Sequence, residues 1–107
     1  MRILFDVNMP DPLRFYLTEH IVDTAREKGW SEVINGNLLE NAERDGYEVL
    51  VTADQSMRYQ QNMTGRQVAV IVLLSNRWPD VQSKIEEIRA ALEGLGPGEI
   101  REVPIWP

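Results

Sequence analysis

The sequence predicts an α/β fold in which a mostly parallel central sheet is covered on both faces, a three-layer α/β/α sandwich. Three observations favour this class. Short apolar runs of the kind found in buried strands recur along the chain. Segments with helical spacing or capping residues separate them. The length of 107 residues suggests one domain spanning residues 1–107. A chain of this length buries roughly 65% of its unfolded surface, which is enough for a hydrophobic core.

Five segments have the pattern of strands. The most apolar holds an unbroken apolar run at residues 68–74, and another contains Val49, Leu50 and Val51. Strands that alternate with helices pair in parallel through crossover connections. Pro104 follows the last segment, which is therefore expected at an edge of the sheet. The expected strands cover residues 1–6, 20–24, 48–53, 67–74 and 99–103.

The clearest helix is predicted over residues 78–95. Apolar side chains recur there every three or four positions, which places them on one face of a helix. One amphipathic helix is therefore expected to pack on the sheet through this face. Its apolar residues are Val81, Ile85, Ile88, Leu92 and Leu95.

Capping signals predict the other helices. Asp11 precedes a proline and has the pattern of an N-cap with proline in the first turn. Asn37 and Glu40 have the spacing of a capping box, and Gly46 is placed to end that helix. A short helix is also expected over residues 56–62.

Composition limits the classes of function. The net charge of −6 argues against broad, non-specific nucleic-acid binding and favours a basic protein partner. The chain has no cysteine, which excludes disulfides and thiolate metal sites and fits a cytoplasmic protein. No apolar run approaches the roughly 20 residues that span a bilayer, so no membrane association is expected. The start of the chain also lacks a signal-peptide pattern.

Polar residues follow the predicted strands where a parallel sheet presents its carboxyl ends. Asp6 ends the first strand and Asp54 follows the third. Ligands of open parallel sheets bind at this edge, so the two carboxylates are expected to lie together. Carboxylates that face each other repel unless a cation lies between them, and Mg²⁺ or Mn²⁺ prefers such oxygen ligands. Asn8 or Asn35 could add a neutral oxygen, and Glu40 could join from its helix.

These residues also have structural interpretations. Asp54 is placed to cap the helix expected after it, and Glu40 completes the capping box. His20 is the sole histidine and is far in sequence from both aspartates, which argues against a Ser-His-Asp triad. Three arginines are candidate phosphate contacts or ordinary surface residues: Arg58, Arg66 and Arg77.

Three motifs occur in a fixed order between residues 3 and 79: ILFDVNMP, NGNLLENAERDGYEVLVTADQSMRYQQN and IVLLSNRWP. In combination they resemble small PIN-like domains of unknown function that are related to toxin ribonucleases. The resemblance implies a parallel α/β sandwich and a Mg²⁺- or Mn²⁺-dependent ribonuclease site built from several acids. It also implies a toxin–antitoxin setting, with RNA as substrate and an antitoxin-like protein as partner. Asp6 and Asp54 match two of the family's acids.

The match is incomplete where related sequences carry further acids. Asn35 and Asn37 stand at the start of the predicted helix, and Ser56 stands after the third strand. Each asparagine removes one negative charge from the expected cation site. Glu40 is the nearby carboxylate that could compensate.

Three hypotheses remain. In the first, the chain is a ribonuclease in which Asp6, Asp54 and Glu40 are catalytic, and Asp6, Asp54 and Asn35 hold the metal. In the second, it is a weak or inactive PIN-like module that binds a protein partner or RNA. The third is a phosphoacceptor receiver domain, which needs an acidic pair after its first strand and a lysine after its last. Val7 and Asn8 follow Asp6, and residues 99–107 contain no lysine. The oligomeric state stays open, with a homodimer compatible with the first two hypotheses.

Overall fold

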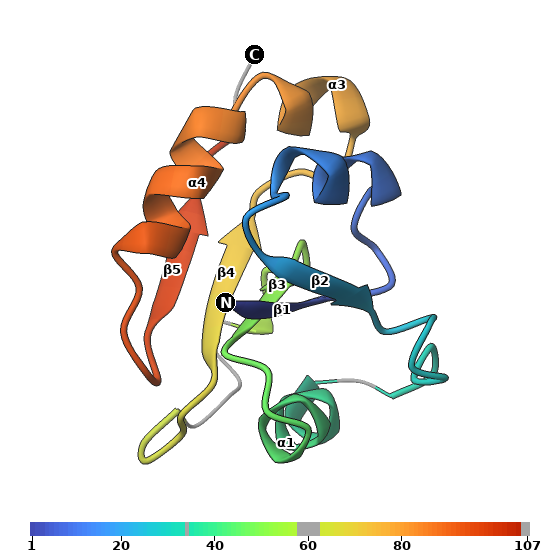
Figure 1. The fold of residues 1–107 in the computed structure, drawn as a ribbon, viewed down its shortest axis with the longest axis vertical. Helices are drawn as coiled ribbons and strands as arrows, with labels where there is room; N and C mark the ends of the chain where they lie inside the picture. Colours follow the sequence, from blue (N-terminus) through green and yellow to red (C-terminus); the bar gives the residue numbers. More distant parts are fainter. Residues whose placement is uncertain (34, 58–62, 106–107) are drawn as a thin grey trace.

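The computed structural model describes residues 1–33, 35–57 and 63–105, with only the backbone of Asn35. Its centre is a five-stranded sheet in the order β2-β1-β3-β4-β5, in which every pair of neighbours is parallel (Figure 1). The predicted α/β class and parallel sheet are therefore confirmed. The strands are β1 (Arg2–Phe5), β2 (Ile21–Thr24), β3 (Val49–Thr52), β4 (Ala69–Leu73) and β5 (Ile100–Val103).

Helices supply the apolar surface that buries the sheet. They are the 3₁₀ helix η1 (Asp11–Tyr16) and the α-helices α1 (Asn35–Arg44), α3 (Trp78–Gln82) and α4 (Ile85–Glu93). Figure 1 shows α1 on the opposite side of the strands from η1, α3 and α4. No helix in the described ranges is long and apolar enough to cross a membrane.

Two apolar clusters meet the sheet because successive side chains of a strand point to opposite faces. The first contains Phe5 and Val51 from the sheet, with Leu13 of η1 and Ile88 of α4. The second contains Leu4, Leu50 and Val70 from the sheet, with Leu38, Leu39 and Ala42 of α1. All residues of β3 and β4 are buried, as their apolar runs predicted.

The single helix predicted over residues 78–95 is wrong, because α3 and α4 are separated at Ser83 and Lys84. The Ser83 hydroxyl donates to the carbonyl of Asp80 at 2.6 Å, a bond that competes with the regular helical pattern. Lys84 then leaves helical geometry, with φ −120° and ψ 22°. The apolar face survives the break, since Val81 and Ile88 are both fully buried.

The predicted helix starts also need correction. Asp11 is the first residue of η1, and Pro10 holds the N-cap position. The capping box is wrong because α1 already begins at Asn35, which places Asn37 and Glu40 inside the helix, where both are exposed. The short helix expected over residues 56–62 lies mostly outside the described residues.

The outer edge of β2 is covered by side chains. Arg14 donates to the carbonyl of Val22 at 2.7 Å and forms an ion pair with Glu27 at 3.1 Å. Glu27 also accepts from the backbone N–H of Thr24 at 2.9 Å. The bond between the two side chains raises the pKa of Arg14 and lowers the pKa of Glu27. The pair therefore occupies backbone groups that an exposed edge strand would offer to another chain.

Tyr47 joins α1 to the first two strands. Its hydroxyl donates to Asp23 Oδ2 at 2.6 Å, and the Arg2 guanidinium lies 4.6 Å from its ring centroid. Arg2 also donates to the carbonyl of Asp45, just after α1, at 2.6 Å. Burial of the phenol, helped by the bond to Asp23, raises the pKa of Tyr47 to about 12.

We expect Ile88→Ala to lower the free energy of unfolding by about 2–4 kcal/mol, because it leaves a cavity between α4 and the sheet. Urea denaturation measures this loss. Glu87→Ala, at an exposed neighbouring position, should change stability by less than about 0.5 kcal/mol. Equal losses in the two variants would show that α4 does not pack through Ile88.

We expect Tyr47→Phe to cost about 1 kcal/mol at neutral pH, because the bond to Asp23 is lost. The pKa of Tyr47 is raised by folding from 10.0 to about 12. The unfolded chain therefore ionises first, and stability falls as pH rises between these values. Urea melts across this range should show a smaller loss for the Phe variant than for the native chain. An equal loss in both would mean that the phenol is not buried.

Candidate functional site

The two predicted aspartates lie at the carboxyl edge of the sheet. Asp6 directly follows β1, and Asp54 lies two residues beyond the end of β3. These strands are neighbours, with Phe5 paired to Val51. The shared edge expected from the sequence is therefore present. Both aspartates are half-buried.

A buried hydroxyl connects the two aspartates. Thr52 is fully buried, and its Oγ1 donates to Asp6 Oδ2 at 2.7 Å. The same oxygen accepts the backbone N–H of Asp54 at 3.0 Å. Thr52 thus fixes the Asp6 carboxylate and the main chain of Asp54 at once. Sequence analysis missed this role; its signal is a hydroxyl residue that ends an apolar strand just before an aspartate.

The loop after β1 is fastened to the end of β3. The backbone N–H of Asp6 donates to the Val51 carbonyl at 2.9 Å, and Asn8 Oδ1 accepts the N–H of Ala53 at 3.2 Å. The backbone N–H of Val7 donates to Asp6 Oδ1 at 2.7 Å. An amide oxygen has two lone pairs, so Asn8 keeps one that a cation could use.

Asp54 has the structural role that the sequence allowed. Its Oδ1 accepts the backbone N–H of Ser56 at 3.0 Å and the Ser56 hydroxyl at 2.6 Å. This is the local pattern by which an aspartate stabilises a turn two residues ahead. Ser56 therefore donates to Asp54 without adding a negative charge to the edge.

The predicted site residues on α1 are not grouped with the two aspartates in the described structure. Asn35 is the first residue of α1, and its side chain lies outside the described part of the structure. Glu40 is exposed in the middle of the helix, and Asn37 is exposed as well. Within the described ranges, no three side chains of the types Asp, Glu, His and Cys are grouped to hold a metal. Glu40 and the two aspartates therefore do not form a three-acid group there.

A second polar cluster follows β4 at the same edge. The Ser75 hydroxyl donates to Asp80 Oδ2 at 3.3 Å and accepts the N–H of Arg77 at 3.1 Å. The Arg77 Nε lies 4.0 Å from Asp80. Sequence analysis had noted Arg77 but not Asp80, whose signal is an acid in the first turn of a helix after a buried strand.

Other candidates lie away from the acids. Arg66 pairs with Glu43 of α1 at 3.5 Å, and Arg58 lies outside the described residues. His20 Nδ1 is 3.3 Å from the amino group of Met1, at the beginning of β1. His20 therefore lies at the amino edge, away from Asp6 and Asp54.

A cavity of about 270 Å³ opens at the amino edge of the sheet. It is therefore separate from the polar network around Asp6 and Asp54. We place the candidate site at the carboxyl edge because its side chains converge there through hydrogen bonds. The cavity is lined by Met1, Glu43, Gly46, Tyr47, Glu48, Val49, Gln67, Ala69, Leu95, Gly96 and Pro97.

The groups at the carboxyl edge fit a hard divalent cation. Asp6 and Asp54 offer carboxylate oxygens, and Asn8 offers an amide oxygen. Mg²⁺ and Mn²⁺ take oxygen ligands, and Mg²⁺ commonly binds through one or two carboxylates while keeping several waters. Two protein carboxylates are therefore enough for such an ion.

Comparison of the chain with protein-family models, curated proteins and solved structures found no match. The resemblance to PIN-like domains therefore depends on the sequence motifs alone.

We expect Thr52→Val to cost about 1–3 kcal/mol, because it leaves the partly buried N–H of Asp54 without its acceptor and Asp6 without a donor. Denaturant melts give the loss. Thr52→Ser keeps the hydroxyl and is the matched control. If the Val and Ser variants are equally stable, the hydroxyl bridge contributes nothing to the fold.

Proposed function

We propose that the chain is a PIN-like domain of three-layer α/β/α architecture that acts as a Mg²⁺- or Mn²⁺-dependent ribonuclease. One observation carries the proposal: the Thr52 hydroxyl bonds the Asp6 carboxylate and the main chain of Asp54 at one edge of the sheet. The apolar clusters on the two faces of the sheet support the architecture. The ordered sequence motifs support the family.

In this proposal, the protein holds the metal and positions the RNA. Asp6 and Asp54 are the anionic ligands, and Thr52 fixes both at the edge. Asn8 holds the loop after β1 against β3 and offers a neutral oxygen. A bound divalent ion supplies an activated water and stabilises charge on the phosphodiester. Glu40 and Asn35 remain candidate supporting residues.

The second candidate is a PIN-like module with little or no activity that binds a protein partner or RNA. A specific observation favours it: Ser56 donates to Asp54 where related sequences have another acid. A site with two carboxylates holds a cation more weakly than one with three or four. The net charge of −6 also suits a basic partner, such as an antitoxin-like protein in the cytoplasm.

Metal titration by calorimetry separates the two candidates. We expect the native chain to bind Mg²⁺ or Mn²⁺, and Asp6→Asn and Asp54→Asn each to abolish binding and Mg²⁺-dependent RNA cleavage, because each removes an anionic ligand. Asp54→Asn should leave the melting temperature within a few degrees, since asparagine and aspartate stabilise such turns about equally.

Glu93→Gln is the control, because it removes one negative charge from an exposed position on α4. It should leave metal affinity unchanged, and Glu40→Gln tests whether that residue supports the site. No binding to the native chain at millimolar metal would leave the inactive module as the function. Unchanged metal affinity in Asp54→Asn would show that Asp54 stabilises its turn but does not bind the metal.

A further inference from the structure

An acidic protein that cleaves RNA must overcome its own repulsion of the substrate. The net charge is −6, and two carboxylates lie at the proposed site. Binding of a nucleic acid depends mainly on cations that contact its phosphates. Cations at the carboxyl edge would supply this attraction without a basic surface elsewhere.

The strand order places one arginine on each side of Asp6 and Asp54, the acid pair. Arg26 lies two residues beyond the end of β2, and Arg77 lies four residues beyond the end of β4. The sheet order β2-β1-β3-β4 sets Asp6 and Asp54 between them. Three strand spacings of about 4.8 Å separate the outer two strands by roughly 14 Å. Along the carboxyl edge the acid pair therefore lies between Arg26 and Arg77, with Glu27 next to Arg26 in the sequence and Asp80 4.0 Å from Arg77.

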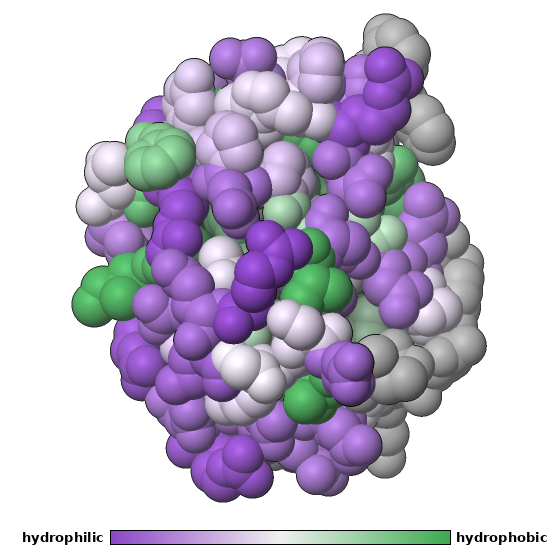
Figure 2. Space-filling view, turned by 90° about the vertical axis from the view of Figure 1, so that its right-hand side faces the viewer, coloured by the Kyte–Doolittle hydropathy of each residue, from purple (hydrophilic) through white to green (hydrophobic). Residues whose placement is uncertain are grey.

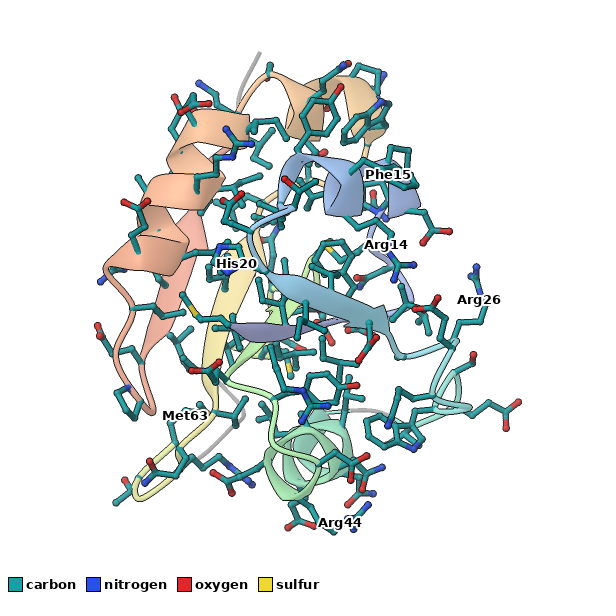
Figure 3. The ribbon with its side chains drawn as sticks, in the orientation of Figure 1. Arg14, Phe15, His20, Arg26, Arg44 and Met63 are labelled. Atoms are coloured by element: carbon teal, nitrogen blue, oxygen red, sulfur yellow. The ribbon has the colours of Figure 1, made fainter. Side chains whose placement is uncertain are left out.

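Both arginines are available to a ligand. Figure 3 shows the Arg26 side chain extending outward beyond the end of β2. Arg26 is exposed and has no ion pair among the described residues. The Arg77 side chain is 76% exposed, and its carboxylate neighbour Asp80 is 4.0 Å away. Figure 2 shows a mainly hydrophilic surface on the side where β2 ends.

Most of the other described arginines hold the fold together. Arg2 donates to the Asp45 carbonyl, Arg14 to Val22, Arg89 to Tyr16 and Arg101 to Gly94, while Arg66 pairs with Glu43. Arg26 and Arg77 make no such bond from their guanidinium groups to the backbone. Arg44 likewise makes none and bonds only side chains, so it is their place on either side of the acid pair that distinguishes Arg26 and Arg77.

We propose that Arg26 and Arg77 bind phosphates on opposite sides of the acid pair, so that single-stranded RNA lies along the carboxyl edge. This inference rests on the proposed function. The planar guanidinium matches a phosphate through paired hydrogen bonds. The substrate is then a strand of several nucleotides, since a dinucleotide reaches neither arginine while its single phosphate lies at the acids.

The test is the binding of a fluorescent single-stranded RNA of about ten nucleotides, a length within usual site sizes. The titration is made in EDTA, because without a divalent ion no activated water is available to cleave the RNA, and anisotropy is followed across salt concentrations. Arg26→Gln and Arg77→Gln should each weaken binding roughly fivefold and reduce the salt slope by about 0.7. The double variant should lose about twice that slope.

Arg44→Gln is the matched control, because it removes the same charge from the end of α1, away from the ends of β1 and β3 that carry the acid pair. Arg44 is the last residue of α1, its side chain is 67% exposed, and its Nε lies 3.9 Å from Asp45. Figure 3 shows it far from Arg26. It should change neither the affinity nor the salt slope. Equal losses in Arg44→Gln and the edge variants would overturn the proposed path, as would failure of the native chain to bind RNA at low salt.

Metal titration of the same variants separates this inference from the proposed function. Arg26→Gln and Arg77→Gln should bind Mg²⁺ as the native chain does. If RNA binding depends on the two arginines but the native chain binds no metal, the ribonuclease function is wrong and RNA binding along the carboxyl edge is supported. If the native chain binds metal but its RNA affinity does not depend on either arginine, the proposed RNA path is wrong and the ribonuclease function is unaffected.

Discussion

All five strands run in the same direction, and this constraint decides where both the helices and the polar residues lie. A parallel connection must return the chain across a face of the sheet before the next strand begins. The returning segments cover β3 and β4, whose residues are all buried. The same direction brings every carboxyl end to one edge. Asp6 and Asp54 meet there although 47 positions separate them in the sequence.

The strand ends are fixed by buried hydroxyls. Thr24 and Thr52 are the buried polar side chains of the described residues, and each ends a strand. A buried polar group needs a hydrogen-bond partner, and each threonine finds its partners in the turn or strand beside it. Thr24 Oγ1 accepts the N–H of Glu27 at 3.1 Å, while Thr52 joins the two aspartates. Both residues therefore convert the end of an apolar strand into a defined turn.

Sequence patterns predicted the features that depend on local burial. The apolar runs predicted β1, β3 and β4, because a strand buried on both faces requires apolar residues at successive positions, whereas β2 and β5 are partly exposed edge strands without such a run. The break at Ser83 was missed because the apolar face continues across it, and its cause is a side-chain bond to Asp80. The link through Thr52 was missed because it needs the register between β1 and β3. The failed capping box at Asn37 shows that spacing alone does not fix a helix start.

The Asp6 carboxylate is held differently from the ion-paired acids of the described structure. At the amino edge, Glu43 of α1 pairs with Arg66, so these charges bind one another and hold α1 against the segment before β4. At the carboxyl edge, the Asp6 carboxylate is held by a hydroxyl and a backbone N–H. These neutral donors fix its position without cancelling its charge. An acid held in this way keeps its attraction for a cation, which is the property a metal site requires.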